Sequence, residues 1–289
     1  MTSRLLPLLL AASMLLGACS SQTDAPDPGA APATGEAAAP APAGDDAAPT
    51  GATSATSAVD ADSADAAGDA RAEAGPNTNP VVPPAGPAPV AGTDYVEIAG
   101  GQPYAPSMGK IEVVEIFGYT CPHCAHFEPL FESWTAKQPA DVKVVPLAAP
   151  FGGYWEPYAR AFYAAEALGV LEPSHAAMFN AIHVDRSMPA PPTVASNEQI
   201  AAFYTKYGAD PKKFASTMNS FAVNAKLKRV GQFLARSGVE STPDLVVNGK
   251  YRVIGGQSFE DRLRITDHLV AMERAAMAPA AAPSAEGAE

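Results

Sequence analysis

The sequence predicts an α/β domain over residues 93–275, placed between a long segment that lacks a core and a short tail. One reason is a β-branched run at residues 111–117, which leads through a short turn into a helical pattern that opens at Cys121. Another is the Asn-Gly pair at residues 248–249, which joins two short apolar runs and is a strong hairpin signal. The predicted order is strand, helix and strand, then a helical block, a hairpin and a last helix.

The first predicted elements are three strands and one helix. Residues 95–98 are predicted as an edge strand, and residues 111–117 and 142–147 as buried strands, because these runs favour β-branched or aromatic side chains. Residues 121–138 are predicted as a helix, because apolar side chains recur there at the spacing i, i+3, i+4 and i+7. These side chains are Phe127, Leu130, Phe131 and Trp134.

A mainly helical insertion is predicted over residues 155–238. Within it, Ser196 begins a capping box with Gln199, and Asp210 precedes a proline at a first helical position, where proline is tolerated. The other elements predicted from here onward are helices over residues 157–168, 222–236 and 258–274 and the hairpin strands 245–247 and 251–254.

Residues 1–18 are predicted to be an export signal. An arginine precedes a short apolar run, residues 5–16, which is too short to span a bilayer comfortably. The ending Leu-Gly-Ala-Cys19 resembles the lipobox of bacterial lipoproteins, which implies that Cys19 is acylated and becomes the first residue of the mature protein. An ordinary signal peptide that is cut nearby is the alternative. Under the sorting rules of that family, Ser20 favours the outer membrane over the inner one.

Residues 19–92 are predicted to be a disordered linker and residues 276–289 a disordered tail. Both are rich in alanine and proline and nearly lack large apolar side chains, so they cannot offset the entropy of ordering. Residues 20–92 carry ten acidic side chains and one arginine, whereas residues 93–275 carry 19 acidic and 17 basic side chains. The domain is therefore nearly neutral, and no basic stripe indicates binding to nucleic acid.

The three cysteines indicate a redox role. If Cys19 carries a lipid, only Cys121 and Cys124 remain as thiols, and they must pair with each other or with another protein. The motif Cys121-Pro122-His123-Cys124 lies at a predicted helix start, where free N–H groups and the helix dipole stabilise a thiolate on Cys121. His123 adds a donor there, and Cys124 is placed to resolve a mixed disulfide.

Other uses of two closely spaced cysteines fit the sequence less well. Zinc needs about four ligands, and the sequence has no second Cys-x-x-Cys motif and no spaced histidine pair. Covalent haem attachment needs a histidine directly after the second cysteine, where Ala125 stands. A purely structural disulfide across one turn would constrain little chain entropy. We therefore expect no metal and no other cofactor.

Three segments are similar to segments of the DsbA-type thiol–disulfide oxidoreductases. The run from Glu115 to Cys124 resembles their active-site segment, residues 164–170 resemble their helical insertion, and residues 242–250 resemble their cis-proline strand and hairpin. The resemblance covers about residues 93–275. It implies a thioredoxin fold with a helical insertion and a monomeric periplasmic enzyme. It also implies donation of the Cys121–Cys124 disulfide to unfolded exported proteins with free thiols, and reoxidation by a DsbB-like quinone-linked membrane oxidase.

Three residues outside the cysteine motif also match the family. Pro243 matches the cis-proline, which lies beside the cysteines and leaves backbone groups free for an extended substrate; a trans proline at a strand start is the alternative. Thr242 matches the residue before it. Glu115 matches a buried acid beneath the cysteines, a candidate proton relay for Cys124, and a solvent-facing strand residue is the alternative.

Two further functions remain open on the sequence alone. Threonine before the cis-proline is frequent in disulfide isomerases, whereas the best-known oxidases usually have valine, so Thr242 also fits an isomerase or reductase that a membrane donor keeps reduced. A lipid-anchored module that only binds peptides is the other alternative, but binding alone needs no thiolate. The histidines at 175, 183 and 268 are interpreted as structural or exposed.

Overall fold

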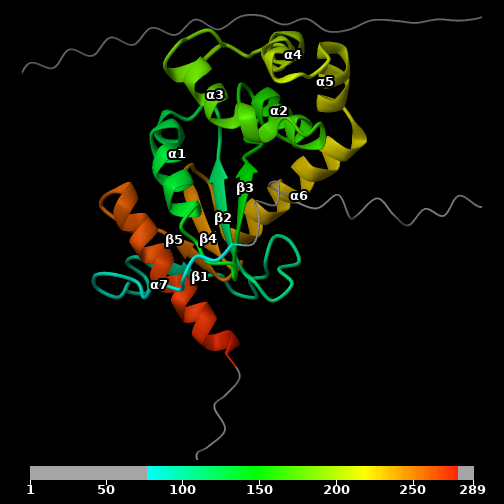
Figure 1. The fold of residues 1–289 in the computed structure, drawn as a ribbon. Helices are drawn as coiled ribbons and strands as arrows, with labels where there is room; N and C mark the ends of the chain where they lie inside the picture. Colours follow the sequence, from blue (N-terminus) through cyan, green and yellow to red (C-terminus); the bar gives the residue numbers. More distant parts are fainter. Residues whose placement is uncertain (1–76, 279–289) are drawn as a thin grey trace, which may run out of the picture. The chain divides into compact units, whose positions relative to one another are not determined.

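The computed structural model describes residues 77–278. The predicted signal peptide, Cys19, the linker up to residue 76 and the tail from residue 279 lie outside the described residues. The described part is a five-stranded mixed sheet with helices on both faces (Figure 1). This arrangement agrees with the predicted α/β fold and its helical insertion.

The central strand of the sheet is β2 (Ile111–Phe117), whose seven residues are all buried. It pairs in parallel with β3 (Val142–Ala148) and antiparallel with β4 (Asp244–Val247), in the sheet order β1-β5-β4-β2-β3. The edge strand β1 (Tyr95–Glu97) pairs antiparallel with β5 (Tyr251–Val253). A strand that is buried on both faces therefore ends shortly before the cysteine motif.

The helices form where their sequence signals predicted them, with one exception. The capping box is present, since Gln199 N donates to Ser196 Oγ at 3.2 Å and Ser196 N donates to Gln199 Oε1 at 3.0 Å. The exception is α3, which begins without a side-chain cap and was not predicted as a separate helix. The helices are α1 (Pro122–Thr135), α2 (Glu156–Ala167), α3 (Leu171–His183), α4 (Asn197–Tyr204), the 3₁₀ turn η1 (Thr205–Tyr207), α5 (Pro211–Met218), α6 (Phe221–Ser237) and α7 (Phe259–Met277).

Two apolar cores cover the two faces of the sheet. On one face α1 and α7 pack over β2, and Trp134 Nε1 of α1 donates to Asp267 Oδ1 of α7 at 2.8 Å. On the other face the helical insertion packs over Val114 and Ile116. Because successive strand residues face opposite sides, Glu115 points to the α1 side rather than to solvent. None of the helices within residues 77–278 is long and apolar enough to cross a membrane.

Residues 77–92, which were predicted as part of the linker, contact the domain. Asn79 Nδ2 donates to the carbonyl of Ala136 at 2.8 Å, just beyond the end of α1. On α7, Arg264 donates to the carbonyl of Pro87. These contacts use side-chain donors and backbone carbonyls, which the composition of residues 77–92 did not reveal. The last helix also extends to residue 277, two residues into the predicted tail.

Candidate active site

The cysteine motif forms the start of α1. Cys121 is the N-cap residue, and its sulfur accepts a hydrogen bond from Cys124 N at 3.4 Å. Pro122 occupies the first helical turn, where a missing N–H costs nothing. Both cysteines are free thiols, with exposed fractions of 6% for Cys121 and 0% for Cys124. The outer sulfur is therefore the one that a partner protein can reach.

The two thiols have opposite electrostatic environments. A hydrogen bond from the Cys124 thiol, supported by the backbone N–H groups of Cys124 and His123, lowers the pKa of Cys121 from 9.0 to about 5, although burial acts against this shift. Burial, and then the hydrogen bond to Cys121 and its charge, raises the pKa of Cys124 far above its ordinary value. At neutral pH Cys121 is a thiolate and Cys124 a thiol. The imidazole of His123 is exposed, so His123 acts on the sulfur through its backbone.

The loop that precedes β4 lies against the outer cysteine. The Thr242–Pro243 peptide bond is cis, and the Thr242 carbonyl oxygen lies 3.5 Å from the Cys121 sulfur, which donates a hydrogen bond to it when Cys121 is protonated. Arg262 on α7 holds the next carbonyl, since its Nη1 donates to Pro243 O at 3.0 Å. The same guanidinium lies 3.6 Å from the buried carboxylate of Asp244. The loop is thus fixed between Cys121 and a buried ion pair.

Glu115 lies on β2 beneath the helix that carries the cysteines. Its side chain is 1% exposed, and Oε1 has no hydrogen-bond partner among residues 77–278. Burial and, to a lesser extent, the charge of Glu128 raise the pKa of Glu115 well above its ordinary value. The carboxyl group therefore keeps a proton at pH values where an exposed glutamate has lost it.

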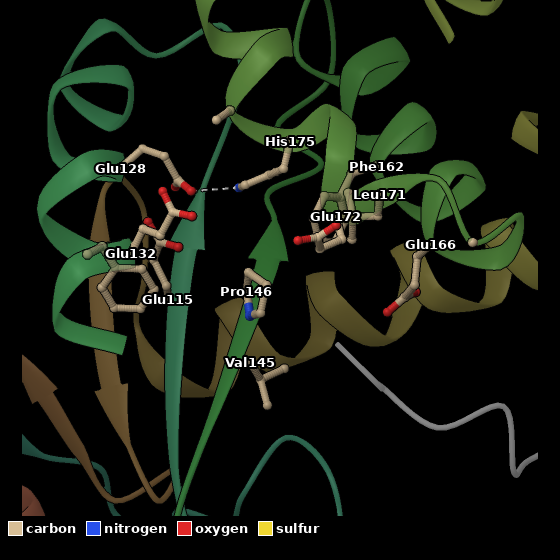
Figure 2. Close-up of a pocket in the computed structure, with 13 residues that line it drawn as sticks. Glu115, Glu128, Glu132, Val145, Pro146, Phe162, Glu166, Leu171, Glu172 and His175 are labelled. Atoms are coloured by element: carbon tan, nitrogen blue, oxygen red, sulfur yellow. Dashed lines mark ion pairs between the residues drawn. The ribbon is translucent and has the colours of Figure 1, made fainter. Parts of the chain in front are cut away.

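A cavity of about 180 Å³ opens beside Glu115, between α1, β3 and the α2–α3 turn. Figure 2 shows Glu115, Glu128 and Glu132 gathered on one side of it and His175 reaching toward Glu128 from α3. His175 Nε2 lies 3.3 Å from Glu128 Oε1, and Nδ1 lies 2.7 Å from the Tyr119 hydroxyl. Polar groups and apolar walls line the cavity together, which suits a water-accessible path to a buried acid.

Comparison with known proteins decides the family. Residues 96–267 match the family model described as Thioredoxin. The chain is 42% identical to the thiol:disulfide interchange protein DsbA of Pseudomonas aeruginosa over 188 residues, which cover 64% of this chain and 86% of the relative. This chain belongs to the DsbA family of thiol–disulfide interchange proteins.

Solved DsbA structures carry the same fold. The crystal structure of DsbA from Xylella fastidiosa shares 49% identity and a TM-score of 0.62, over 65% of this chain and 98% of the other. The crystal structure of Pseudomonas aeruginosa DsbA shares 41% identity and a TM-score of 0.59 with this chain, over 65% of this chain and 95% of the other. The predicted thioredoxin fold is confirmed, and the DsbA-family chain is a protein disulfide oxidoreductase.

The structure brings most residues predicted for the DsbA-type site together. Cys121, Cys124 and Thr242 are in direct contact, and Glu115 lies on the α1 side of the sheet. Within the part of the chain that is described, no group of three or more His, Cys, Asp or Glu side chains is arranged to hold a metal ion. Cys19 lies outside the described residues.

Three residues around the site were not found by sequence reasoning. Glu128 follows Cys124 by four residues on α1 and is therefore on the same helix face, a spacing that could have indicated it. His175 was interpreted as structural or exposed, because nothing in its local sequence links it to Glu128. Arg262 had no signal, because its role depends on the fold that brings α7 to the cis-proline loop.

Proposed function

We propose that this DsbA-family chain donates a Cys121–Cys124 disulfide to exported proteins during their oxidative folding. The observation that carries the proposal is the asymmetry of the two thiols, one held as an anion at a helix start and the other buried and protonated. A stabilised thiolate makes the reduced form favourable, so the disulfide form is a strong oxidant. The substrates are unfolded chains with free thiols.

The proposed reaction is two successive thiol–disulfide exchanges. A substrate thiolate attacks the Cys121 sulfur, the Cys121–Cys124 bond breaks, and Cys124 leaves with the electron pair and takes up a proton. A second substrate thiolate then attacks the mixed disulfide, which forms the substrate disulfide and releases Cys121 as a thiolate. Glu115 is the proposed proton donor to Cys124, and the cis-Pro243 loop, with Thr242, is the proposed binding site for an extended substrate. A DsbB-like membrane oxidase would restore the Cys121–Cys124 disulfide.

The oxidase function predicts a high reduction potential. We expect the couple to be more oxidising than about −180 mV, the value of protein disulfide isomerase. Equilibration with glutathione buffers measures the potential, and oxidation of a peptide with two thiols measures the activity. A potential near that of thioredoxin, about −270 mV, would contradict the oxidase proposal. The peptide assay would then be repeated with a scrambled disulfide protein to test the isomerase or reductase alternative, comparing the wild type with Thr242→Val.

A monomeric, lipid-anchored form in the periplasm is the proposed setting of the enzyme. It is supported by the lipobox-like sequence that ends at Cys19 and by the acidic, proline-rich segment that follows. The peptide-binding alternative without redox turnover is disfavoured by the low pKa of Cys121, since peptide binding needs no thiolate.

Replacing the acylated cysteine should release the protein from the membrane. Each buried methylene contributes about 0.8 kcal/mol and one chain alone binds marginally, so stable anchoring depends on the several chains of a lipoprotein. We expect Cys19→Ser to appear in a soluble or unprocessed form, with thiol oxidation by the purified protein unchanged. Cell fractionation measures where the variant is located, and the peptide assay measures its thiol oxidation. A mature Cys19→Ser protein that stays in the membrane fraction would exclude the anchor.

A further inference from the structure

Two buried carboxyl groups share the cavity beneath the cysteines. Glu115 on β2 is 1% exposed and Glu128 on α1 is 7% exposed, and the charge on Glu128 opposes ionisation of Glu115. Burial and the charge of Glu128 both favour the protonated form of Glu115, so this carboxyl group keeps a proton at pH values where an exposed glutamate has lost it. Whether the proton stays on Glu115 depends on the charges that face the two carboxyl groups.

One basic side chain faces the pair across the cavity. His175 is the single Lys, Arg or His among the residues that line the cavity, and it contacts Glu128 at 3.3 Å (Figure 2). Rings of the surrounding core enclose it, with the Phe117 ring centroid at 5.1 Å. The titratable groups that face it from the packed elements and from its own helix are Glu115, Tyr119, Glu128, Glu132, Glu166 and Glu172; of these Glu166 pairs with Lys226 at 2.5 Å.

The other ring nitrogen of His175 is tied to the segment that enters the active site. Nδ1 lies 2.7 Å from the hydroxyl of Tyr119, two residues before Cys121. Burial, followed by Tyr204 and the charge of Glu128, raises the pKa of Tyr119, so its hydroxyl stays neutral. A neutral hydroxyl accepts from a protonated imidazole and donates to a neutral one. Tyr119 therefore orients His175 toward Glu128 in both charge states.

Glu128 is also on the helix that carries the buried cysteine. Cys124 and Glu128 are four residues apart on α1, which places them on the same helix face, and both are buried. A negative charge on Glu128 that nothing offset would oppose the negative charge that develops on Cys124 as it leaves the disulfide. An imidazolium against Glu128 removes that opposition.

We propose that His175 is a positioning residue of the redox centre, whose ion pair with Glu128 keeps the proton of the buried site on Glu115. Glu115 then supplies that proton when the Cys121–Cys124 bond breaks and Cys124 leaves with the electron pair. His175 itself touches neither sulfur nor substrate. The inference rests on the proposed function, because it concerns the proton that the oxidase step consumes.

His175→Gln is the test variant, and His183→Gln is its matched control. His183 lies on the same helix and its Nε2 contacts the backbone carbonyl of Tyr119 at 2.7 Å, but it does not line the cavity. We expect His175→Gln to oxidise a two-thiol peptide about tenfold more slowly at pH 7, since acid–base assistance contributes 10²–10⁴-fold and Glu115 remains. The pH midpoint of the rate should move by about one pH unit. In His183→Gln the rate at pH 7 and the pH midpoint should both stay at their wild-type values.

A double variant separates this role from a structural one. If His175 serves to offset the charge on Glu128, Glu128→Gln should restore most of the rate lost in His175→Gln, because no charge is left to offset. If His175 only holds α3 against α1, the double variant should be as slow as the single one or slower. Equal rates for wild type and His175→Gln, or a double variant without recovery, would overturn the proposal.

The location of the proton is measured without any turnover. NMR of protein labelled with carbon-13 glutamate reports which carboxyl group is protonated at pH 7. The variants Glu115→Gln and Glu128→Gln serve to assign the two carboxyl signals. We expect the protonated signal to be Glu115 in the wild type and to shift to Glu128 in His175→Gln; a protonated Glu128 in the wild type would refute the proposal. A wild type that oxidises no peptide would contradict the proposed function, and this titration would still decide the role of His175.

Discussion

Substrate proteins are expected to accumulate as mixed disulfides on Cys121 in a Cys124→Ala variant. The variant loses the Cys124 thiol that contributes most to the low pKa of Cys121, but the backbone N–H groups of residues 123 and 124 still favour the thiolate. Cys121 attacks a disulfide of a partner protein and releases one of the two partner sulfurs as a thiolate, so a mixed disulfide forms. The internal thiol that would release the partner is gone. The mixed disulfide should therefore persist until an external thiol reduces it.

The reverse variant should trap almost nothing. In Cys121→Ala the remaining sulfur of Cys124 is fully buried, and burial keeps its pKa far above its ordinary value. It is neither ionised nor reachable, so we expect on the order of tenfold fewer adducts than in Cys124→Ala. Non-reducing electrophoresis of cell extracts, with and without added reductant, measures both variants. Equal trapping would show that the nucleophile is assigned to the wrong cysteine.

Predicting the fold and the cysteine centre from the sequence succeeded where the signals are local. The run 111–117 is buried along its whole length, and the Asn-Gly pair at 248–249 does join β4 to β5. The position of Cys121 at a helix start followed from the change between strand and helix patterns. Each of these features depends on residues within about one turn or strand of each other.

The parts that were missed depend on contacts between distant segments. His175 lies 47 residues after Glu128 in the sequence, and Arg262 lies 19 residues after Pro243, so no local pattern links them. Glu112 is a charged residue that can be buried in β2, because its carboxylate accepts hydrogen bonds from two backbone N–H groups in the loop before the strand. A charged residue inside an apolar strand signals an unusual environment, but its partners come only from the fold.

The reduced protein is expected to be more stable than the oxidised one above neutral pH, and less stable in acid. The pKa of Cys121 is about 5 in the folded reduced form against an ordinary 9.0. Between these values the unfolded chain binds a proton that the folded chain does not, so the free energy of unfolding rises with pH across that window. The contribution is complete above pH 9, at about 5 kcal/mol, and is lost as the pH falls through 5.

The competing term is the disulfide itself, which stabilises the oxidised form by restricting its unfolded chain. Closing a loop of four residues contributes about 2 kcal/mol. At pH 8 the thiolate contributes about 4 kcal/mol, so the reduced form should be more stable by about 2 kcal/mol. At pH 4 the thiolate contribution is absent and the oxidised form should be more stable by a similar amount. Glu115 titrates in both forms and largely cancels from the difference.

Calorimetry of both redox forms from pH 4 to pH 8 tests this reversal. A difference of about 2 kcal/mol corresponds to about 4–8 °C for a domain of this size, and its sign should change between pH 5 and pH 7. In Cys121→Ala, which has neither the thiolate nor the disulfide, the rise in stability across this window should be absent. A reduced form that melts below the oxidised form at pH 8 would show that the Cys121 thiolate is not stabilised by the fold, and the oxidase proposal would lose its physical basis.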